Sequence, residues 1–278
     1  MRWIIIIIIA LLLIAGTGTG LYLYNNRLEQ DVNILLMGTD SSDEYTHHAD
    51  TLIVVHFSVI QKKITFISIP RDTRVIYRKK TRKINSVYVI NYNAGSYPKA
   101  NNEMLKIVST VLREEVNYYA QVDYDGIKEI VDFFGGVRVN IEQKMYYKDE
   151  AGGLLIDFDP GVRLLNGSDA VKYLRFRKDG NADVGRMDRQ QKFMFKLAAI
   201  IMEKLNAGNI LSLYARVSKS MNTNVPPDRA AYLYRVFRSY DLHDSSRFIL
   251  PGVPFYEDKQ AYWKVDSVKT KELFESRK

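Results

Sequence analysis

The fold is decided between residues 31 and 69, which read DVNILLMGTDSSDEYTHHADTLIVVHFSVIQKKITFISI. Three apolar segments separated by polar residues predict three buried strands, and the short polar turn before the third predicts a hairpin of the last two. Asp40 follows the first strand and Asp50 opens the second, so both carboxylates are expected at strand ends, where loops usually carry function. The three predicted strands cover residues 31–37, 52–58 and 64–69.

Downstream, helical and strand patterns alternate, which predicts an α/β fold with a sheet covered by helices. An amphipathic helix, a strand, a second helix and a further strand are expected at 101–116, 118–124, 126–134 and 137–141. A hairpin region and a helix capped by Asn166 and ending at Arg175 follow. The rest of the chain predicts helices at 186–205, 228–240 and 267–276, and strands at 247–250 and 261–265.

The stretch from Arg175 to Gln190 concentrates basic residues around a loop and the start of the helix expected near Arg186. Arg175 and Arg177 are two apart and would point to the same side of an extended chain. Arg186, Arg189 and Gln190 would share one face of the first helical turn. Cations oppose the dipole at a helix N-terminus, a conflict that a bound phosphate would resolve. The alternative is a solvated basic face.

An uncharged apolar run at residues 3–24 is long enough to cross a membrane. A cleavable signal peptide is the alternative, but the length of the run favours an uncleaved anchor. We therefore expect a membrane anchor and short linker at 1–30 and one domain at 31–278. The expected topology is single-pass in the cell membrane, with the N-terminus cytoplasmic and the catalytic domain extracellular.

The chain has 278 residues, a formal net charge of +8 and a pI of about 9.3. A basic surface favours polyanionic partners such as nucleic acid, anionic lipid or a phosphate-bearing polymer. The absence of cysteine excludes disulfides and thiolate zinc sites. The segment 71–83 carries seven cations and one acid, which indicates an exposed basic loop, an electrostatic guide for a polyanion, or both.

The chemistry-bearing residues are carboxylates at strand ends and several arginines. Nucleophile-elbow, phosphate-loop and zinc-histidine motifs are absent from the sequence. The adjacent pair His47-His48 does not favour a metal site, because neighbouring side chains diverge in extended chain. Carboxylates bind hard cations such as Mg²⁺ and arginines bind phosphate oxygens. These are the parts that phosphoryl transfer requires.

Eight short motifs, in order from about residue 33 to 205, resemble the LytR–CpsA–Psr family. The motifs are Gly38-Thr39-Asp40, Ala49-Asp50-Thr51, Ser68-Ile69-Pro70-Arg71-Asp72, Lys83-Ile84-Asn85, Val131-Asp132 with Gly135-Gly136-Val137, Leu165-Asn166-Gly167, Arg175-Phe176-Arg177, and Asp183-Val184-Gly185-Arg186-Met187-Asp188-Arg189-Gln190.

This resemblance implies a membrane-anchored phosphotransferase outside the cytoplasm. Such an enzyme moves a glycopolymer, for example a teichoic acid, from a polyprenyl diphosphate carrier to a sugar hydroxyl of peptidoglycan. The implied fold is an α/β/α sandwich with a central mixed sheet and an apolar lipid tunnel between sheet and helices. We expect Val108, Val111, Ile130 and Leu197 to contribute to that tunnel. The implied cofactor is Mg²⁺.

The resemblance also assigns roles to individual residues. Asp40 and Asp50 would hold Mg²⁺ or act as the base, and together with Arg71 they form the implied catalytic set. The diphosphate would be gripped by Arg71, Arg175, Arg177, Arg186 and Gln190. One departure is His48, because family members usually carry arginine two residues before the second-motif aspartate. Histidine changes charge near neutral pH, so a different substrate, a weaker transfer and a loss of activity are open alternatives.

Two other functions remain compatible with these residues. A polyprenyl diphosphate hydrolase would use the same arginines and aspartates with water as the nucleophile. A non-catalytic regulator would bind an anionic polymer or lipid through the basic surface. The expected partners are the lipid-linked glycopolymer, the peptidoglycan acceptor and membrane lipid. No nucleic acid is expected, since the anchor would place the domain outside the cell.

Overall fold

The computed structural model describes most of the chain after residue 30. The described ranges are 31–39, 48–59, 61–93, 97–150, 153–176, 182–204, 209–226 and 245–275, together with Arg229 and Leu233. The expected membrane segment and its topology lie outside these residues, as does nearly all of the helix expected at 228–240. Among the helices described, none is both long enough and apolar enough to cross a membrane.

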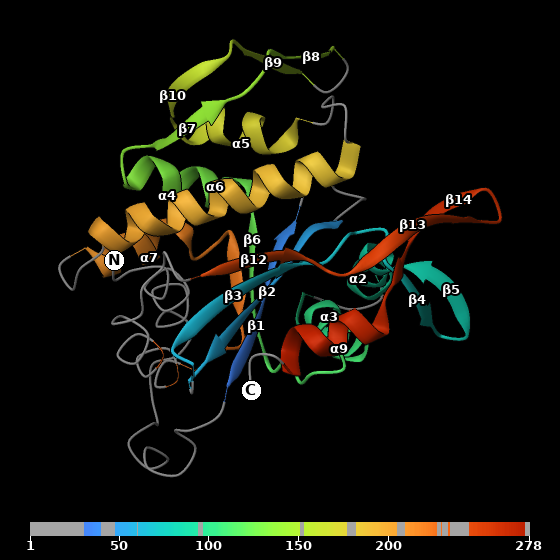
Figure 1. Cartoon of the computed structure of the whole chain (residues 1–278). Helices are drawn as coiled ribbons and strands as arrows, with labels where there is room; N and C mark the ends of the chain where they lie inside the picture. The colour runs from blue at the N-terminus through green and yellow to red at the C-terminus, as the bar shows by residue number, and fades with distance from the viewer. Residues whose placement is uncertain are drawn as a thin grey trace.

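A mixed sheet forms the centre of the molecule (Figure 1), as the family resemblance implies. Its strand order is β11-β6-β1-β2-β3-β12, in which β1 and β6, and likewise β3 and β12, run parallel. The predicted hairpin is β2 paired antiparallel with β3. The strand bounds are β1 (Val32–Thr39), β2 (Ala49–Ser58), β3 (Lys63–Ser68), β6 (Tyr118–Asp123), β11 (Met221–Thr223) and β12 (Ser246–Ile249).

The central strands are apolar on both faces because helices cover both sides of the sheet. On β2, Val55 and Phe57 pack into one core, whereas Leu52 and Val54 pack into the other, as the two-residue period of a strand requires. The first core is covered by α4 (Tyr124–Phe133), α5 (Gly167–Arg175), α6 (Ala182–Lys204) and α7 (Ile210–Val217). The second is covered by α2 (Ile84–Tyr92), α3 (Tyr97–Leu112) and α9 (Ser267–Glu275). The result is the three-layered arrangement visible in Figure 1.

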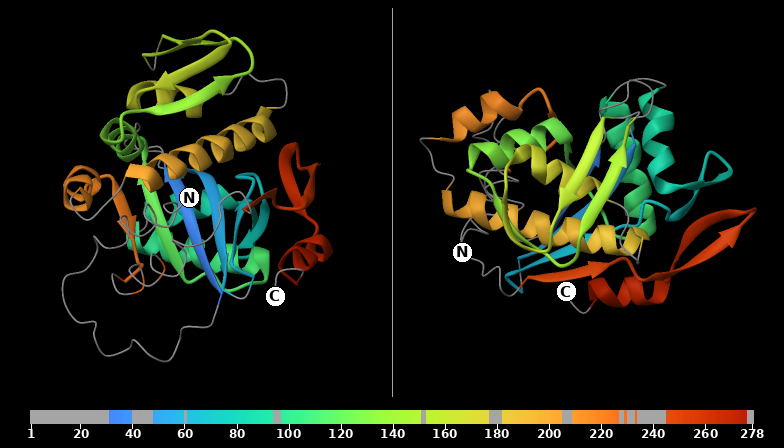
Figure 2. Two further views of the ribbon diagram at one scale, coloured as in Figure 1. Left: turned by 60° about the vertical axis from the view of Figure 1, so that its left-hand side comes forward. Right: turned by 90° about the horizontal axis from the view of Figure 1, so that it is seen from above.

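In the part of the chain that the structure describes, four two-stranded sheets project from these layers (Figure 2). The segment expected to be a basic loop is in fact a hairpin, whose turn places Arg78 and Lys79 at positive φ. The single hairpin region expected near 149–162 is divided between two sheets. The pairs are β4 (Arg74–Tyr77) with β5 (Lys80–Lys83), β7 (Val137–Ile141) with β10 (Gly161–Leu165), β8 (Met145–Asp149) with β9 (Leu154–Phe158), and β13 (Gly252–Glu257) with β14 (Gln260–Val265).

Candidate active site

One edge of the central sheet collects polar side chains because strand ends meet there. Thr39 ends β1 and Asp123 ends the parallel strand β6, so their carboxyl ends lie side by side. On the other flank, Gly38 pairs with Thr51 and Thr39 with Ala49, which leaves Asp50 as an extra residue on β2. Such a bulge redirects a side chain and is common beside active sites. It places Asp50 at this edge of the sheet.

Arg71 holds the Asp50 carboxylate from the adjoining loop. Its Nη1 lies 3.3 Å from both Oδ1 and Oδ2 of Asp50, and the two side chains are 24% and 15% exposed. Asn85, at the start of α2, places its Nδ2 at 3.5 Å from Asp50 Oδ1 and donates its backbone N–H to the Arg71 carbonyl. A half-buried ion pair supported from a helix start fixes the direction of both charged groups.

Arg175 and Gln190 reach the same edge from the helical layer. Arg175 ends α5, and its Cζ lies 5.6 Å from the ring centre of Tyr124, which begins α4 directly after β6. Gln190 is buried on α6 and lines a small cavity together with Thr39 and Thr51, the residue after Asp50. The structure therefore brings residues from four separate motifs to one edge.

Other expected site residues fall beyond what is described. Asp40 and Arg177 lie outside the described residues. Arg186 belongs to α6, but its side chain is not among those described. The helix begins at Ala182 rather than near Arg186, so Arg186 occupies its second turn. The argument from an unfavourable charge in the first helical turn is therefore wrong, because Asp183 sits in that turn.

The cavity beside Gln190 lies between the sheet and α4, α5 and α6, and its volume is about 50 Å³. That volume accommodates little more than a few water molecules, not a polyprenyl tail. Its walls are largely apolar and include Ile127, Leu174 and Met194. The expected contribution of Val108 and Val111 is wrong, since both pack on the opposite face of the sheet.

Ile130 and Leu197 do pack on the same side of the sheet as the cavity. Each follows a cavity-lining residue, Ile127 or Met194, by three positions on the same helix, about one turn deeper into the core. These two residues therefore extend the apolar path away from the sheet edge, although they do not line the cavity itself.

Arg189 was predicted to bind an anion together with Arg186 and Gln190. In the structure it makes a structural contact instead. It is 9% exposed, and its Nε donates to the Tyr173 carbonyl at 3.1 Å. A second guanidinium nitrogen donates to the Phe176 carbonyl. These two carbonyls flank Arg175 in the chain, so Arg189 fixes the end of α5 against α6 and thereby positions Arg175.

Two of the family-like motifs also serve the scaffold. The backbone N–H of Gly167 donates to Asp132 Oδ1 at 2.7 Å, which joins the start of α5 to α4. A Cβ at Gly167 would lie 2.4 Å from the Lys128 carbonyl oxygen, so only glycine permits this approach. The turn after α4 uses Gly135 and Gly136 at positive φ. These motifs hold α5, and with it Arg175, in place.

A buried chain of polar side chains supports the sheet edge from the α3 side and was not predicted. Asn101 Nδ2 donates to Gln121 Oε1 at 3.0 Å, and Gln121 Nε2 donates to Thr39 Oγ1 at 3.1 Å. All three residues are buried. Asn101 lies three and four residues before Met104 and Leu105, on the apolar stripe of its helix. A polar residue on such a stripe needs a buried partner, and that signal was available in the sequence.

The neighbouring carboxyl group, Asp123, is an acid whose ionisation the fold opposes. Burial raises the pKa of Asp123, although its side chain accepts the backbone N–H of Gly126 at 2.9 Å as the N-cap of α4. It lines the small cavity with Tyr124. Asp123 thus adds a carboxyl group to the edge that Asp50 already occupies, from β6 on the other side of β1.

The carboxylates fit a magnesium site that is completed by substrate. In the described part of the chain, no three acidic or histidine side chains gather as a metal-binding group. Mg²⁺ is usually held by one or two carboxylates together with substrate phosphates and water. Asp50 is redirected to the edge by the bulge, and the donor set there consists of hard oxygen atoms. His48 immediately precedes β2 and is half-buried.

Comparison with known proteins identifies the relatives of the chain. The LytR_cpsA_psr family model matches residues 22–278. The Bacillus subtilis strain 168 protein named polyisoprenyl-teichoic acid–peptidoglycan teichoic acid transferase TagV is 27% identical over 228 residues, which cover 81% of this chain and 57% of that protein. TagU of Bacillus mycoides strain KBAB4, which carries the same transferase name, is 29% identical, with 80% and 69% covered. The crystal structure of B. subtilis TagV superposes with a TM-score of 0.72 at 25% identity, covering 90% and 96% of the two chains.

Proposed function

Because the chain belongs to the LytR–CpsA–Psr family, we propose that it transfers a teichoic acid or related glycopolymer from a polyprenyl diphosphate carrier to peptidoglycan. The observation that carries the proposal is the convergence of Asp50, Arg71, Arg175 and Gln190 at one sheet edge beside an apolar cavity. The transferase names of the TagV and TagU relatives support the substrate class. The proposed location is outside the cytoplasm, with residues 3–24 as the membrane anchor.

The reaction joins an acceptor oxygen to phosphorus. A sugar hydroxyl of the acceptor forms a bond to the phosphorus that carries the polymer, and the bond from that phosphorus to the bridging oxygen breaks. The bridging oxygen keeps the electron pair and leaves as part of polyprenyl phosphate. The hydroxyl proton passes to a carboxylate at the sheet edge. The product is a phosphodiester between polymer and acceptor, so atoms and charge balance without hydrolysis.

The arginines supply the charge that this step requires. Arg71 is fixed by Asp50, and Arg175 is fixed by the aromatic ring of Tyr124 and by the contact of Arg189 with the end of α5. Preorganised guanidinium groups bind phosphate oxygens with little reorganisation during the reaction. Arg177 and Arg186 are proposed to complete the diphosphate site with Gln190.

Asp50 and Asp40 are the residues that would hold Mg²⁺, with the remaining positions filled by diphosphate oxygens and water. When bound there, Mg²⁺ would neutralise the charge of the diphosphate and of the leaving phosphate. Asp50 is itself held by Arg71 on one side, which keeps its carboxylate at the edge in the absence of metal.

The lipid tail is proposed to enter at the small cavity. Thr39 and Gln190 lie at its polar end, whereas Ile127, Leu174 and Met194 make its walls apolar. The cavity must widen to accept a tail, by movement of α6 and its side chains away from the sheet. The unbranched Met194 side chain suits such a rearrangement.

The test uses the full-length chain in lipid nanodiscs with a synthetic polyprenyl diphosphate saccharide and a peptidoglycan oligomer. We expect phosphodiester product from the wild type and at least a hundredfold slower formation by Asp50→Asn, because removal of a catalytic carboxylate typically costs 10²–10⁴-fold. Asp159→Asn is the matched control, since Asp159 is an exposed, ion-paired carboxylate in the connection between β9 and β10. Unchanged turnover by Asp50→Asn would contradict the assignment and leave a binding protein as the better interpretation.

A further inference from the structure

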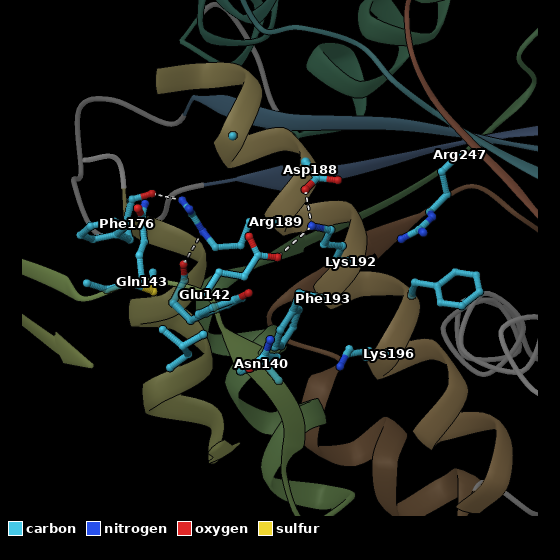
Figure 3. A pocket seen from close by; sticks show the side chains of 16 residues that line it. Asn140, Glu142, Gln143, Phe176, Asp188, Arg189, Lys192, Phe193, Lys196 and Arg247 are labelled. Atoms are coloured by element: carbon cyan, nitrogen blue, oxygen red, sulfur yellow. Dashed lines mark hydrogen bonds and ion pairs between the residues drawn. The ribbon is translucent and has the colours of Figure 1, made fainter. Parts of the chain in front are cut away.

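A second and larger groove lies along α6 (Figure 3). Its volume is about 820 Å³, within the usual range for ligand-binding sites. Side chains of α6, of β7 and the residues after it, of the end of α5, and of Arg247 on β12 line it. None of these side chains lines the cavity beside Gln190, so the two spaces are separate features of the fold.

One end of the groove lies next to the proposed diphosphate site. Phe176 and Asp188 line this end, and Phe176 directly follows Arg175 at the end of α5. From Asp188, the groove follows α6 to Lys196, a span of eight residues or about 12 Å along the helix axis. A polymer lying in the groove would therefore have one part near the diphosphate and the remainder along α6.

The middle of the groove is polar, and its ion-paired side chains carry one more negative charge than positive. Lys192 Nζ lies 2.7 Å from Asp188 Oδ2 and 3.2 Å from Glu142 Oε1, so one cation is shared by two acids. The exposed amides of Asn140 and Gln143 lie on the facing segment (Figure 3). Hydroxyl and acetamido groups of a sugar can donate to and accept from such a surface, whereas the repeated phosphates of an anionic polymer would meet two exposed carboxylates.

The far end of the groove is cationic. Arg247 lies with its Cζ 5.3 Å from the ring centre of Phe195, and Lys196 donates to the backbone carbonyl of Arg138 at 3.2 Å. Within the described residues, neither side chain forms an ion pair with an acid. These two cations, next to an aromatic ring, suit a carboxylate at the end of a substituent on a sugar strand.

We propose that this groove binds the acceptor, a peptidoglycan strand; this inference rests on the proposed function. The sugars would lie between α6 and β7, with their hydroxyl and acetamido groups on Asn140, Glu142 and Lys192. A peptide-stem carboxylate would contact Lys196 and Arg247. The groove would thus present a sugar hydroxyl at its Asp188 end to the phosphorus held at the neighbouring sheet edge.

The experiment measures binding of a soluble peptidoglycan oligosaccharide with its peptide stems to the full-length chain in nanodiscs, by calorimetry. We expect Arg247→Ala and Lys196→Ala each to weaken this binding about tenfold, since each removes a charge-assisted contact. Asn140→Ala should weaken it less. In the transfer assay, the same variants should raise KM for the acceptor and leave the affinity for the lipid diphosphate unchanged. Arg163→Ala is the matched control, because Arg163 lies 5.8 Å from the Phe158 ring but outside the groove.

Wild-type affinity for the oligosaccharide in the Arg247→Ala and Lys196→Ala double variant would overturn the inference. Reduced affinity for a soluble teichoic acid, with unchanged affinity for the oligosaccharide, would overturn it in favour of a donor-polymer groove. The calorimetry measures binding without turnover, so a failure of this groove assignment can be distinguished from a failure of the proposed transferase function. A wild type that binds the oligosaccharide in this groove but never transfers to it would refute the transferase and retain the groove assignment.

Discussion

Arg175 offers the simplest test of phosphate binding by a single residue, because it sits at the sheet edge without belonging to the Asp50–Arg71 pair. Arg175→Ala should lose roughly 1.5–3 kcal/mol of affinity for a polyprenyl diphosphate, as expected for a hydrogen bond to a charged group. Arg175→Lys should recover only part of the lost affinity, since lysine lacks the planar, forked guanidinium group. The measurement is lipid-diphosphate affinity in nanodiscs.

Arg216→Ala is the appropriate control for that substitution. Arg216 also lies over an aromatic ring, 5.7 Å from the centre of Phe133, but on α7 and away from the sheet edge. The affinity of the Arg216→Ala variant for the lipid diphosphate should equal that of the wild type. Equal affinities in Arg175→Ala and wild type, with both proteins folded, would show that Arg175 has only a structural role.

At the same scale, the sequence predicts which residues come together but not how. Asp50, Arg71, Arg175 and Gln190 could be selected by motif, and strand ends predicted that the carboxylates lie at an edge. The bulge that redirects Asp50 depends on the register between β1 and β2, which no local pattern specifies. Arg189 was grouped with Arg186 by helical spacing, yet its partners are carbonyls of another helix.

The contact between α5 and α6 can be tested through Arg189. Arg189→Met retains much of the apolar volume but leaves the carbonyls of Tyr173 and Phe176 without their buried donor. We expect a loss of about 1–3 kcal/mol in unfolding free energy, together with weaker diphosphate binding because Arg175 lies between those carbonyls. Urea unfolding and lipid affinity are the readouts. A normal lipid affinity in the folded variant would show that Arg189 does not position Arg175.

The packing of α5 on α4 depends on Gly167. An added methyl group in Gly167→Ala would meet the Lys128 carbonyl at 2.4 Å, so α5 must shift, at a cost of about 1–3 kcal/mol in stability. The exposed neighbour Ser168 provides the control substitution Ser168→Ala, which should be nearly neutral. Unfolding midpoints in urea compare the two. Equal midpoints for Gly167→Ala and Ser168→Ala would show that the close approach of α5 to α4 is not required.

Elements with long apolar periods were predicted from the sequence, and those without such a period were missed. The α3 and α4 helices have clear apolar faces; α4 was expected close to its observed bounds, whereas α3 was expected at 101–116 and lies four residues earlier, at Tyr97–Leu112. The β4–β5 hairpin was taken for a loop because its cations hide the strand pattern. The α2 helix was missed because it carries no side-chain N-cap and has apolar residues around much of its circumference. Strand β13 contains Pro254, which weakens a strand prediction.

For the whole molecule, buried tyrosines predict a loss of stability at alkaline pH. Burial raises the pKa of Tyr88 and of Tyr119. The unfolded chain ionises these groups from about pH 10, whereas the folded chain keeps them protonated. The unfolded state then binds fewer protons, so stability falls as pH rises through 10, by up to about 1.4 kcal/mol per pH unit for each tyrosine.

Tyr88→Phe isolates one of these contributions. Urea unfolding between pH 8 and 11 should show a shallower decline for this variant than for the wild type. Tyr146→Phe is the control, since Tyr146 is 52% exposed, and it should retain the wild-type slope. A decline in Tyr88→Phe as steep as in the wild type would contradict the raised pKa of Tyr88.

The architecture as a whole was predictable in class but not in connectivity. Alternating helices and strands indicated a sheet covered by helices. Two helical layers are needed because the central strands are apolar on both faces. The parallel pairing of β12 with β3 joins residues about 180 positions apart, and the three-residue strand β11 joins the edge of β6. Such pairings depend on how the completed layers fit, so they cannot be predicted from any local segment.

The most direct test of the transferase proposal is the source of the oxygen atom in the new phosphate bond. The full-length chain, the polyprenyl diphosphate saccharide and the peptidoglycan oligomer are incubated in ¹⁸O-labelled water, and the products are weighed by mass spectrometry. We predict a phosphodiester of polymer and oligomer and a polyprenyl phosphate, neither containing ¹⁸O, because the attacking oxygen comes from a sugar hydroxyl. Incorporation of ¹⁸O into a released phosphate monoester, with no phosphodiester formed, would contradict the account and identify the protein as a hydrolase.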